Sequence, residues 1–274
     1  SNANVLDGCR MKLKSREDAL SAVTERSTKL QIDARSMDSR IAMLAEMEKD
    51  FEGYSKAVKT VMREASRGNL RGVHGPVANL VRADAECALA IETALGGAAQ
   101  NIVVDTQNDG RSAIELLKRA DAGRATFLPL DAIRGTVITN APERDHGFVG
   151  VAFDLARFDD KYKSVFANLL GRTVVAETLA DAVRMAKQSG NTLRIVTLDG
   201  QLINAGGSMT GGSAARGSGI LSRANELEKL RRQRAKLVER EKECADELER
   251  AKSSLSSVRY QLDMALEDQA ELKS

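Results

Sequence analysis

The residues whose types and spacing could carry chemistry fall into two groups, one of glycines and one of basic side chains. The segment Gly206 to Gly212 reads Gly-Gly-Ser-Met-Thr-Gly-Gly. A phosphate-binding P-loop requires a lysine after its glycines, and this run has none. A dinucleotide-binding fingerprint requires a helix that opens directly after the glycines, within a parallel strand–helix unit, and none is predicted here. We therefore do not interpret the run as a nucleotide site.

The same glycines, Gly206, Gly207, Gly211 and Gly212, have two structural interpretations that the residues leave open. In the first, they form a flexible connector between a strand and the last helix. In the second, they remove the Cβ atoms from a strand edge, so that another backbone can approach closely. An exposed sheet edge of that kind invites pairing with a second chain.

The basic group forms a stripe on a predicted helix. Lys56, Lys59, Arg63 and Arg67 follow one another in steps of three and four, and Arg71 lies just beyond them. This spacing puts the charges on one helix face, which suits phosphate contacts and nonspecific DNA binding. The alternative interpretation is a solvated face opposite the apolar side of the same helix.

No group of residues predicts catalysis or metal binding. His74 and His146 are the only histidines and lie in unrelated predicted loops. None of the three cysteines belongs to a CxxC pair, which argues against a zinc ribbon or hook. Asp154, Asp159 and Asp160 precede a predicted helix and are interpreted as helix caps. We predict no catalytic residue, no metal site and no enzymatic activity in this chain.

Two heptad tracts flank the middle of the chain. Mostly apolar residues recur in alternating steps of three and four, which places them on one narrow helix stripe, as in a coiled-coil seam. The first tract has these residues at Leu6, Cys9, Leu13, Arg16, Leu20, Val23, Ser27, Leu30, Ala34, Met37, Ile41, Leu44, Phe51 and Val58. The last tract has them at Leu227, Leu230, Leu237, Cys244, Leu248, Ala251, Leu255, Val258, Leu262, Ala265 and Leu272.

These tracts predict two long helices that pair antiparallel, with Cys244 facing the middle of the first helix. The first helix is predicted to continue to about Ser66, where Arg67-Gly68-Asn69 ends it. Cys9 would then lie far from Cys244, so the thiols are interpreted as buried and reduced in a cytoplasm.

Composition narrows the possible functions. The chain has 274 residues, with 29% charged residues, a net charge of +2 and 3% aromatic residues. Because the charges nearly cancel, any DNA contact must come from a local patch. The scarcity of aromatic residues argues against a base-stacking platform for single strands. No apolar run reaches about 18 residues, so no membrane span is predicted.

The middle of the chain repeats one order of elements, helix–Gly–strand–helix–strand, after about 70 residues. Its strands include 102–104 in the first copy and 173–175 in the second. This order indicates two related subdomains joined by 142–150, although chance alternation of helices and strands gives the same pattern. Asp199-Gly200 predicts a tight β-hairpin.

Two further segments carry turn or strand signals. Gly72 to Pro76 is predicted to be a loop, because its glycines and proline oppose a continued helix. Arg124 to Leu128 is predicted to be a strand that Pro129 breaks.

Several segments in this order resemble one family, the hinge domain of SMC (structural maintenance of chromosomes) proteins, and most closely the bacterial condensin-type proteins. The matching segments are 72–75, 80–81, 90–97, 100–104, 123–130, 169–175, 196–200 and 206–213. The resemblance covers essentially all of 53–213, with coiled coil on both sides. It implies an α/β fold, namely a two-subdomain hinge with short mixed sheets, flanked by two long helices that form an antiparallel coiled coil.

The resemblance also implies a function. Such hinges form ring-like homodimers through strand edges of opposite subdomains, with the paired glycines, here Gly206, Gly207, Gly211 and Gly212, at the contact. Relatives often carry several lysines after the last glycine pair, where this chain has Arg216 and later Arg223. DNA binding is therefore expected to rely more on the stripe from Lys56 to Arg71, with Arg216 and Arg223 as further candidates.

From the resemblance we expect the parent protein to be a cytoplasmic, nucleoid-associated ATPase that acts in chromosome condensation and segregation. ATP, Mg²⁺ and kleisin-type subunits would bind its head domains, which this chain lacks, so no cofactor is expected here. The alternative is a coiled-coil spacer carrying a globular protein-interaction module without a DNA role. The predicted domains are an expression scar at 1–3, a coiled-coil helix at 4–52, a hinge at 53–213 (subdomains about 68–140 and 150–213), and a second coiled-coil helix at 214–274.

Overall fold

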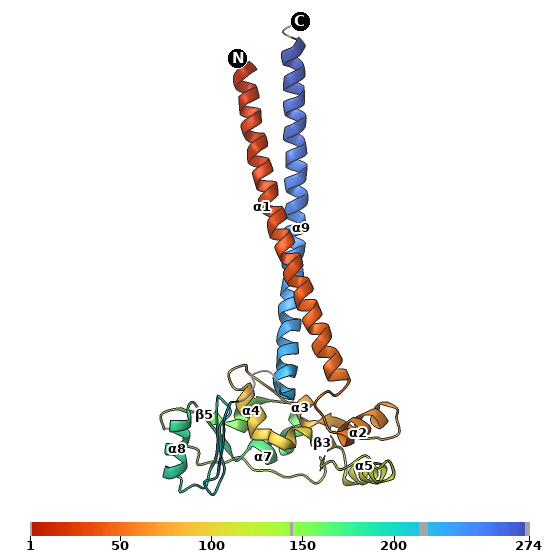
Figure 1. Ribbon diagram of the computed structural model, residues 1–274, viewed down its shortest axis with the longest axis vertical. Coiled ribbons are helices and arrows are strands. Elements are labelled where there is room, and N and C mark those ends of the chain that lie inside the picture. Colours follow the sequence, from red (N-terminus) through yellow and green to blue (C-terminus); the bar gives the residue numbers. More distant parts are fainter. Residues whose placement is uncertain (1, 143–144, 214–218, 272–274) are drawn as a thin grey trace. The chain divides into compact units, whose positions relative to one another are not determined.

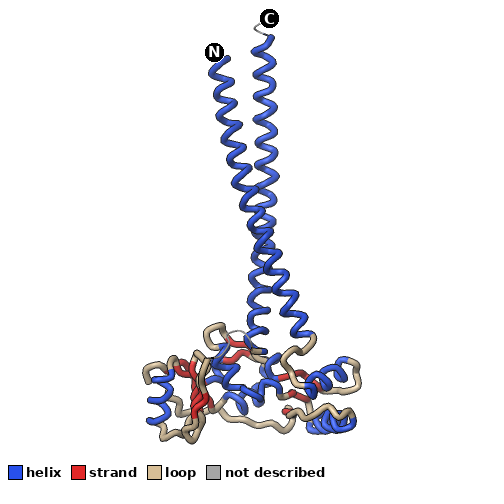
Figure 2. Tube along the Cα trace, in the orientation of Figure 1, coloured by secondary structure: helices blue, strands red, loops and turns tan. Residues whose placement is uncertain are grey.

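The computed structural model describes residues 2–142, 145–213 and 219–271 (Figure 1). The chain divides into two compact bodies. One body contains the chain up to Met43 together with the chain from Lys229 onward, and the other runs from Leu44 to Glu228. Figure 2 shows that the first body is helical, whereas the second mixes short strands, helices and loops. Within the described residues, no helix combines the length and apolar character needed to cross a membrane.

The helical body is formed by α1 (Asn2–Lys49) and α9 (Ile220–Glu271). Their ion pairs show that the helices run antiparallel, because the partner's number falls as the α1 number rises. The pairs are Glu17–Arg259 at 3.1 Å, Arg26–Glu247 at 2.7 Å and Asp38–Arg234 at 2.8 Å. The predicted antiparallel coiled coil is confirmed.

The seam of this coil follows the heptad prediction. Leu30, Ala34, Leu237 and Cys244 form a buried cluster, against which Val23 packs. The Cys244 Sγ lies 3.9 Å from the Val23 carbonyl oxygen, so this thiol faces the middle of α1 as predicted. Leu272, the last predicted seam residue, lies outside the described residues.

The prediction that the first helix continues to about Ser66 is wrong. α1 ends at Lys49, and a separate helix, α2 (Lys56–Ser66), follows with Ser55 as its N-cap. Between them Phe51 and Gly53 have φ values of 50° and 88°, in the left-handed region that no α-helix contains. Phe51 and Val58 therefore leave the predicted seam and join the core of the second body. Both residues fit the heptad spacing, but they serve a different apolar cluster.

The first half of the second body contains one three-stranded sheet with the order β1-β3-β4. Its β1–β3 pair is antiparallel and its β3–β4 pair is parallel. The elements are β1 (Val73–Pro76), α3 (Val77–Leu80), β2 (Arg82–Ala83), α4 (Ala88–Leu95), a 3₁₀ helix (Gly96–Gln100), β3 (Ile102–Val104), α5 (Gln107–Arg119) and β4 (Phe127–Pro129).

One local prediction for this half is wrong, and a second is right about the strand but not about its bounds. The segment predicted as a loop at 72–76 contains β1, which tolerates Pro76 because an edge strand does not need every N–H group. Gly75 there has φ 137° and sits at an irregularity in the register. The strand predicted at 124–128 is present with shifted bounds: it is β4, it begins at Phe127, and Pro129 is its last residue rather than its breaker. β4 is also an edge strand, so the same reason applies.

The second half contains a five-stranded sheet with the order β10-β9-β8-β7-β5. A hairpin at Asp199-Gly200 joins antiparallel β8 and β9, as predicted, but of the two residues only Gly200 has a positive φ, 83°, so the turn is not the primed type in which both central residues have one. The elements are β5 (Phe148–Val151), α6 (Ala152–Leu155), β6 (Ala156–Arg157), a 3₁₀ helix (Asp160–Tyr162), α7 (Lys163–Leu170), β7 (Thr173–Ala176), α8 (Leu179–Gln188), β8 (Arg194–Thr197), β9 (Leu202–Ile203) and β10 (Met209–Thr210).

The two halves repeat each other in detail. In each, an antiparallel strand pair has a register irregularity, between Val73 and Gly75 in β1 and between Phe148 and Gly150 in β5. Each sheet then continues with a parallel pair, β3–β4 or β7–β8. The repeat predicted from the order of elements is therefore present in the structure.

Helix caps repeat in the same way. The hydroxyl of Thr106 accepts a hydrogen bond from the backbone N–H of Asp109 at the start of α5, and Thr178 does the same with Asp181 at the start of α8. A threonine cap followed by an acidic residue three positions later satisfies free N–H groups at a helix start.

The halves share one cluster of buried residues. Ile91 of α4 and Phe166 of α7 are fully buried in the same cluster, together with Val103 of the first sheet and Val175 of the second. The short strands β2 and β6 pair antiparallel across the two halves. Each half also has a buried cluster of its own, around Ile102 and Leu117 in the first half and around Val174 and Met185 in the second, so the shared cluster joins two smaller cores.

The start of α9 belongs to this core as well. Leu221 is fully buried. Ile220 packs against the cluster that both halves share and against the first-half cluster around Val58 and Leu117. Glu92 of α4 accepts hydrogen bonds from the Ser222 hydroxyl at 2.7 Å and from the Ser222 N–H at 3.3 Å. A side chain added at Gly219 would collide with the Glu92 carboxylate, so it would displace the group that accepts the hydrogen bonds from Ser222.

Candidate interface sites

The first glycine pair makes a hairpin turn. Gly206 and Gly207 have φ values of 91° and 92° and connect β9 to β10. The Asn204 N–H donates to the Ser208 carbonyl at 2.8 Å, and the Gly207 N–H donates to the Asn204 carbonyl at 2.9 Å. The Gly206 N–H donates to the Asn191 carbonyl at 2.8 Å, which ties the turn to the end of α8. Glycine is needed at both positions because other residues rarely adopt this φ.

The second glycine pair follows β10 and contacts one side chain. The Gln201 amide accepts a hydrogen bond from the Gly212 N–H at 2.8 Å and donates to the Gly212 carbonyl at 3.1 Å. Gly212 has φ 139°. A Cβ atom on Gly211 would collide with the Gln201 amide oxygen. The structure therefore supplies reasons within the chain for all four glycines.

β10 is the outer strand of the five-stranded sheet, and its Met209 side chain is 57% exposed. β9 and β10 pair with Thr210 opposite Leu202. Ser208 and Gly212 also direct backbone groups inward, to Asn204 and Gln201. Because backbone groups alternate along a strand, the N–H and C=O of Met209 and Gly211 point to the outer edge.

The first half has an open edge at the equivalent side of its sheet. β4 pairs with β3 alone, whereas β8 is covered by β9. The Thr126 carbonyl and the Leu130 N–H both bond β3, at 2.8 and 2.9 Å. The alternation then turns the N–H and C=O of Phe127, and of Ala125 before it, toward the outer edge. Two open strand edges thus lie in different halves.

The predicted basic stripe lies on α2 and just beyond it. Lys56, Arg63, Arg67 and Arg71 are exposed, and Lys59 is half-buried. The helix turns its other side to the core, where Ala57, Val58 and Val61 are buried. Arg67 also pairs with Glu64 of the same helix at 2.9 Å. The stripe is therefore placed on one solvent-facing side.

Sequence reasoning missed three basic residues near this stripe. The Lys56 ammonium donates to the Asp121 carbonyl at 3.2 Å, which brings the start of α2 next to the end of α5. Lys118, Arg119 and Arg124 are exposed around that point. Their proximity depends on how α2 packs on α5, so the spacing along the chain gave no signal for it.

The other two predicted DNA residues differ in environment. The Arg223 guanidinium donates to the Glu52 carbonyl at 2.6 Å, close to the turn after α1. Gly53 packs against the same guanidinium, because a Cβ atom added at Gly53 would lie 2.9 Å from one of its nitrogens. Arg223 is thus engaged within the chain. Arg216 lies outside the described residues.

The predicted histidines have structural partners. His74 lies in β1, not in a loop, and its Nε2 is 2.7 Å from Asp105 while its Nδ1 is 3.0 Å from the Tyr162 hydroxyl. The His74–Tyr162 contact connects the two halves. His146 lies 3.5 Å from Asp181. In the part of the chain that the structure describes, no cluster of His, Cys, Asp or Glu side chains is arranged to hold a metal ion.

Hydrogen bonds shift the pKa values of two side chains, Asp181 and Lys161. Those from Thr178 and then Arg184 lower the pKa of Asp181 to about 2. The Tyr162 hydroxyl beside Lys161 raises the pKa of that ammonium. Asp159, predicted as a cap, accepts from the Lys161 N–H at 3.2 Å at the start of the second 3₁₀ helix. These interactions are explained by helix capping and contact between neighbours.

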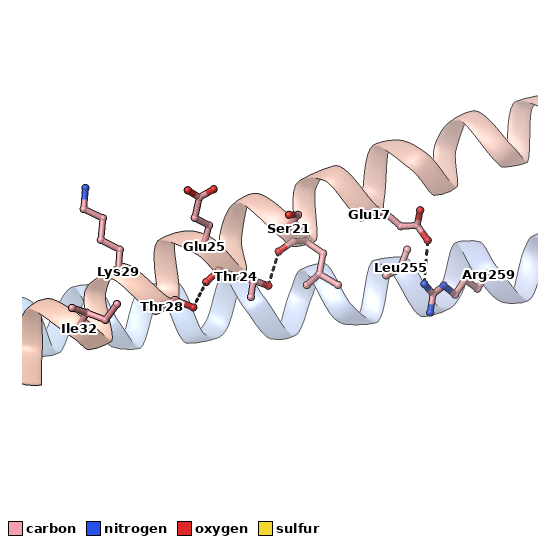
Figure 3. Close-up of a pocket in the computed structure, with 10 residues that line it drawn as sticks. Glu17, Ser21, Thr24, Glu25, Thr28, Lys29, Ile32, Leu255 and Arg259 are labelled. Atoms are coloured by element: carbon pink, nitrogen blue, oxygen red, sulfur yellow. Dashed lines mark hydrogen bonds and ion pairs between the residues drawn. The ribbon is translucent and has the colours of Figure 1, made fainter.

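The coil carries a shallow groove of about 910 Å³ beside its seam (Figure 3). α1 contributes Leu20, Thr24 and Ile32, and α9 contributes Leu255 and Arg259. The Thr24 hydroxyl donates to the carbonyl of the preceding turn at Leu20, at 2.7 Å. Glu17 of α1 and Arg259 of α9 form an ion pair in the lining at 3.1 Å, so the groove is a mixed helix surface whose charged groups already pair with each other.

Comparisons with known proteins agree on one family. The family described as "SMC proteins Flexible Hinge Domain" matches residues 70–186. The Chromosome partition protein Smc of Desulfitobacterium hafniense is 39% identical over 209 residues, 74% of this chain and 17% of that protein. The protein of the same name from Bacillus subtilis is 39% identical over 222 residues, 79% of this chain and 18% of that protein. The chain thus spans less than a fifth of these relatives.

Solved structures show the same similarity. The SMC hinge domain of Geobacillus stearothermophilus, determined as an asymmetric dimer, matches with a TM-score of 0.75 and 36% identity. The match covers 91% of this chain and 99% of that one. The Pyrococcus furiosus SMC hinge domain matches with a TM-score of 0.51 and 30% identity, over 65% of this chain and 91% of that one.

Proposed function

The chain belongs to the family of SMC hinge domains, and we propose that it joins two copies of a chromosome-organising SMC protein into a homodimer. The observation that carries this proposal is the pair of open strand edges in different halves. The outer edge of β10 presents Met209, and the outer edge of β4 presents Phe127. The relative from Geobacillus stearothermophilus, a hinge solved as a dimer, supports the same assembly.

The two edges are complementary in length. β10 has two residues and β4 has three, so each has only a few outward backbone groups. Pairing β10 of one copy with β4 of the other would satisfy these groups and cover the exposed Met209 side chain. A twofold axis makes this contact twice, which closes the assembly at two chains. Gly211 lies on the β10 edge of this contact, beside Met209.

The test removes single outward N–H groups. Met209→Pro removes a donor from the β10 edge, and Ala125→Pro removes one from the β4 edge, without touching a ladder bond inside either sheet. Each variant should raise the dimer dissociation constant by at least about tenfold in sedimentation experiments. Met209→Ala and Ala125→Ser, which keep the N–H, are the matched controls and should dimerise normally.

Mixing the two proline variants tests the pairing of opposite halves. Each pure variant loses both contacts of its dimer, but a mixed dimer keeps one contact in which β10 and β4 are both unaltered. The mixture should therefore associate more tightly than either variant alone. Equal weakness in the mixture, or a purified chain that is monomeric at high concentration, would favour the alternative of a coiled-coil spacer with a protein-interaction module.

We further propose weak, nonspecific DNA binding by the stripe from Lys56 to Arg71, extended by Lys118, Arg119 and Arg124. The exposed positive charges on adjoining helices support it, because phosphate contacts need local positive charge on a near-neutral chain. Arg216 remains a candidate in this role, whereas Arg223 is less suited because its guanidinium already bonds a carbonyl.

Charge reversal tests this second role. A variant with Lys56, Lys59, Arg63 and Arg67 changed to Glu should lose binding to a labelled duplex in fluorescence anisotropy. Its salt dependence should also flatten, by up to roughly 3 in the slope of log K against log salt. A control variant reverses four exposed charges of α1, namely Lys12, Lys14, Lys29 and Arg35. If the first variant bound the duplex as tightly as the parent chain, the proposal that the stripe binds DNA would be wrong.

For the whole protein we propose an ATPase that partitions chromosomes in the cytoplasm, at the nucleoid. The names of the relatives from Desulfitobacterium hafniense and Bacillus subtilis support the chromosomal role. ATP with Mg²⁺, and kleisin-type subunits, would bind head domains outside this segment. Calorimetry of this chain with ATP and Mg²⁺ should accordingly show no binding heat. A measurable heat would contradict the proposal that ATP binds only to the head domains.

A further inference from the structure

We propose that Gln201 is a positioning residue that presets the β10 edge for dimerisation. The proposal rests on the dimer function above. It assigns the need for glycine at position 211 to Gln201 of the same chain, rather than to the backbone of a partner.

The Gln201 side chain takes the place that a neighbouring strand would occupy. Its amide accepts from the Gly212 N–H at 2.8 Å and donates to the Gly212 carbonyl at 3.1 Å. In an antiparallel sheet, two opposed residues exchange the same two bonds. The amide therefore extends the β9–β10 ladder beyond Thr210, where the backbone pairing ends.

This extension sets the direction of the outer groups. Because Gly212 points inward to Gln201, the alternation turns the N–H and C=O of Gly211 outward, in line with those of Met209. Gly212 has φ 139°, a conformation that glycine adopts freely. If the Gln201 amide were removed, Gly212 would lose both of these hydrogen bonds and the segment after Thr210 would sample many conformations.

The packing at Gly211 explains why it has no side chain. A Cβ atom there would collide with the Gln201 amide oxygen and lie 3.3 Å from the amide carbon. Gln201 is flexible, so an alanine would displace the amide rather than clash permanently. The cost would be the loss of both hydrogen bonds to Gly212. Gly206 differs, because an added Cβ atom would meet nothing within 4 Å and only its φ of 91° demands glycine.

Preorganisation explains the benefit to association. A segment held in its bound conformation loses less conformational entropy when a partner arrives. Losing two hydrogen bonds that fix the edge should weaken dimerisation by about tenfold. The folding of the remaining body should be nearly unaffected, because Gln201 and Gly212 lie at the rim of the sheet.

A double-mutant cycle tests the proposal in the whole chain. Dissociation constants are measured by sedimentation for the parent, Gln201→Ala, Gly211→Ala and the double variant, with thermal unfolding as a check of folding. We expect each single variant to weaken the dimer by about tenfold and the double variant to be no weaker than either single one. Amide exchange of Gly212, measured in monomeric samples at low concentration, should accelerate in all three variants.

Two outcomes would overturn the proposal. If Gly211→Ala weakens the dimer further in the Gln201→Ala background, the glycine is required by the partner and not by Gln201. If Gln201→Ala dimerises as the parent does, the amide does not position the edge. Failure of the dimer function itself is a separate result, because Met209→Pro would then leave association unchanged whatever happens at Gln201.

Gln201→Glu is the isosteric comparison. The carboxylate still accepts from the Gly212 N–H, but when ionised it cannot donate to the Gly212 carbonyl and instead repels that oxygen. Its dimer should be weakened near neutral pH and should recover as the glutamate is protonated, toward about pH 4. An equally tight dimer at neutral pH would contradict the role of the donated bond.

Discussion

The two halves of the hinge share a common plan but end differently. In each, an irregular antiparallel strand pair is followed by a parallel pair and a threonine-capped helix. The first half stops at β4, which has no neighbour on its outer side. The second half adds β9 and β10 beyond the equivalent strand β8. On this side of the sheet, the open edge is therefore β4 in the first half and β10 in the second.

This difference shows how a duplicated unit acquires two unlike surfaces. Two identical halves would present two identical edges, and an edge that pairs with itself does not distinguish one partner from another. The added hairpin makes one edge short and glycine-rich, while the other keeps Pro129 at its end. The buried cluster that both halves share joins the two edges within one compact body.

The largest effect on both halves is expected when a side chain is removed from the cluster that they share. Phe166 is fully buried, and changing it to Ala should cost about 3–5 kcal/mol of unfolding free energy. Both halves should lose stability together, because residues of each contact the same cluster. Chemical denaturation followed by probes in each half checks this. Two separate transitions would show that the halves fold independently.

A matched pair of glycines tests how closely the halves correspond. Gly72 and Gly147 have φ values of 67° and 78°, and each lies against the capping aspartate, Asp109 or Asp181. Changing either to Ala should cost about 2–3 kcal/mol, from the strained φ and the displaced cap together. Denaturant unfolding measures both.

The control for this pair is Gly190→Ala. Gly190 has φ 62°, but a Cβ atom there would meet nothing within 4 Å. It should cost only about 1 kcal/mol, the price of the left-handed φ. If all three variants lost the same stability, the aspartate contacts would be irrelevant.

The cap at the start of α8 should make the stability of the chain depend on pH in the acid range. The pKa of Asp181 is lowered to about 2 in the folded chain, by Thr178 first and Arg184 next. A lowered folded pKa stabilises the protein above the ordinary carboxyl value, and this contribution is lost as pH falls from about 4 to about 2. Asp181→Asn should lack that loss, which unfolding midpoints across this range would reveal. A parallel acid decline in both proteins would contradict the assignment.

Much of the architecture could be predicted from sequence, because heptads, glycine ends and turn residues are local signals. The antiparallel coil, the repeat and the hairpin at Asp199-Gly200 are of this kind. The end of the first helix was missed because Phe51 and Val58 keep the heptad spacing while serving another core. Apolar spacing does not say which cluster a residue joins.

The site was less accessible to prediction. The glycine run was recognised as unusual, but its partner Gln201 is identified only when β9 folds back beside it. In the same way, Lys118 joins the basic surface through helix packing, and Arg223 is engaged by a carbonyl of the turn after α1. Such pairings depend on contacts between segments far apart in the chain, which no short motif encodes.

The root of α9 has a mechanical consequence. Ile220 contacts both main clusters, Leu221 is fully buried, and Glu92 holds Ser222. Tension applied along this helix would therefore load both halves at once instead of peeling a single strand. A force that pulls on α9 would have to disrupt buried contacts in both halves, so we expect this body to unfold cooperatively and at a high force.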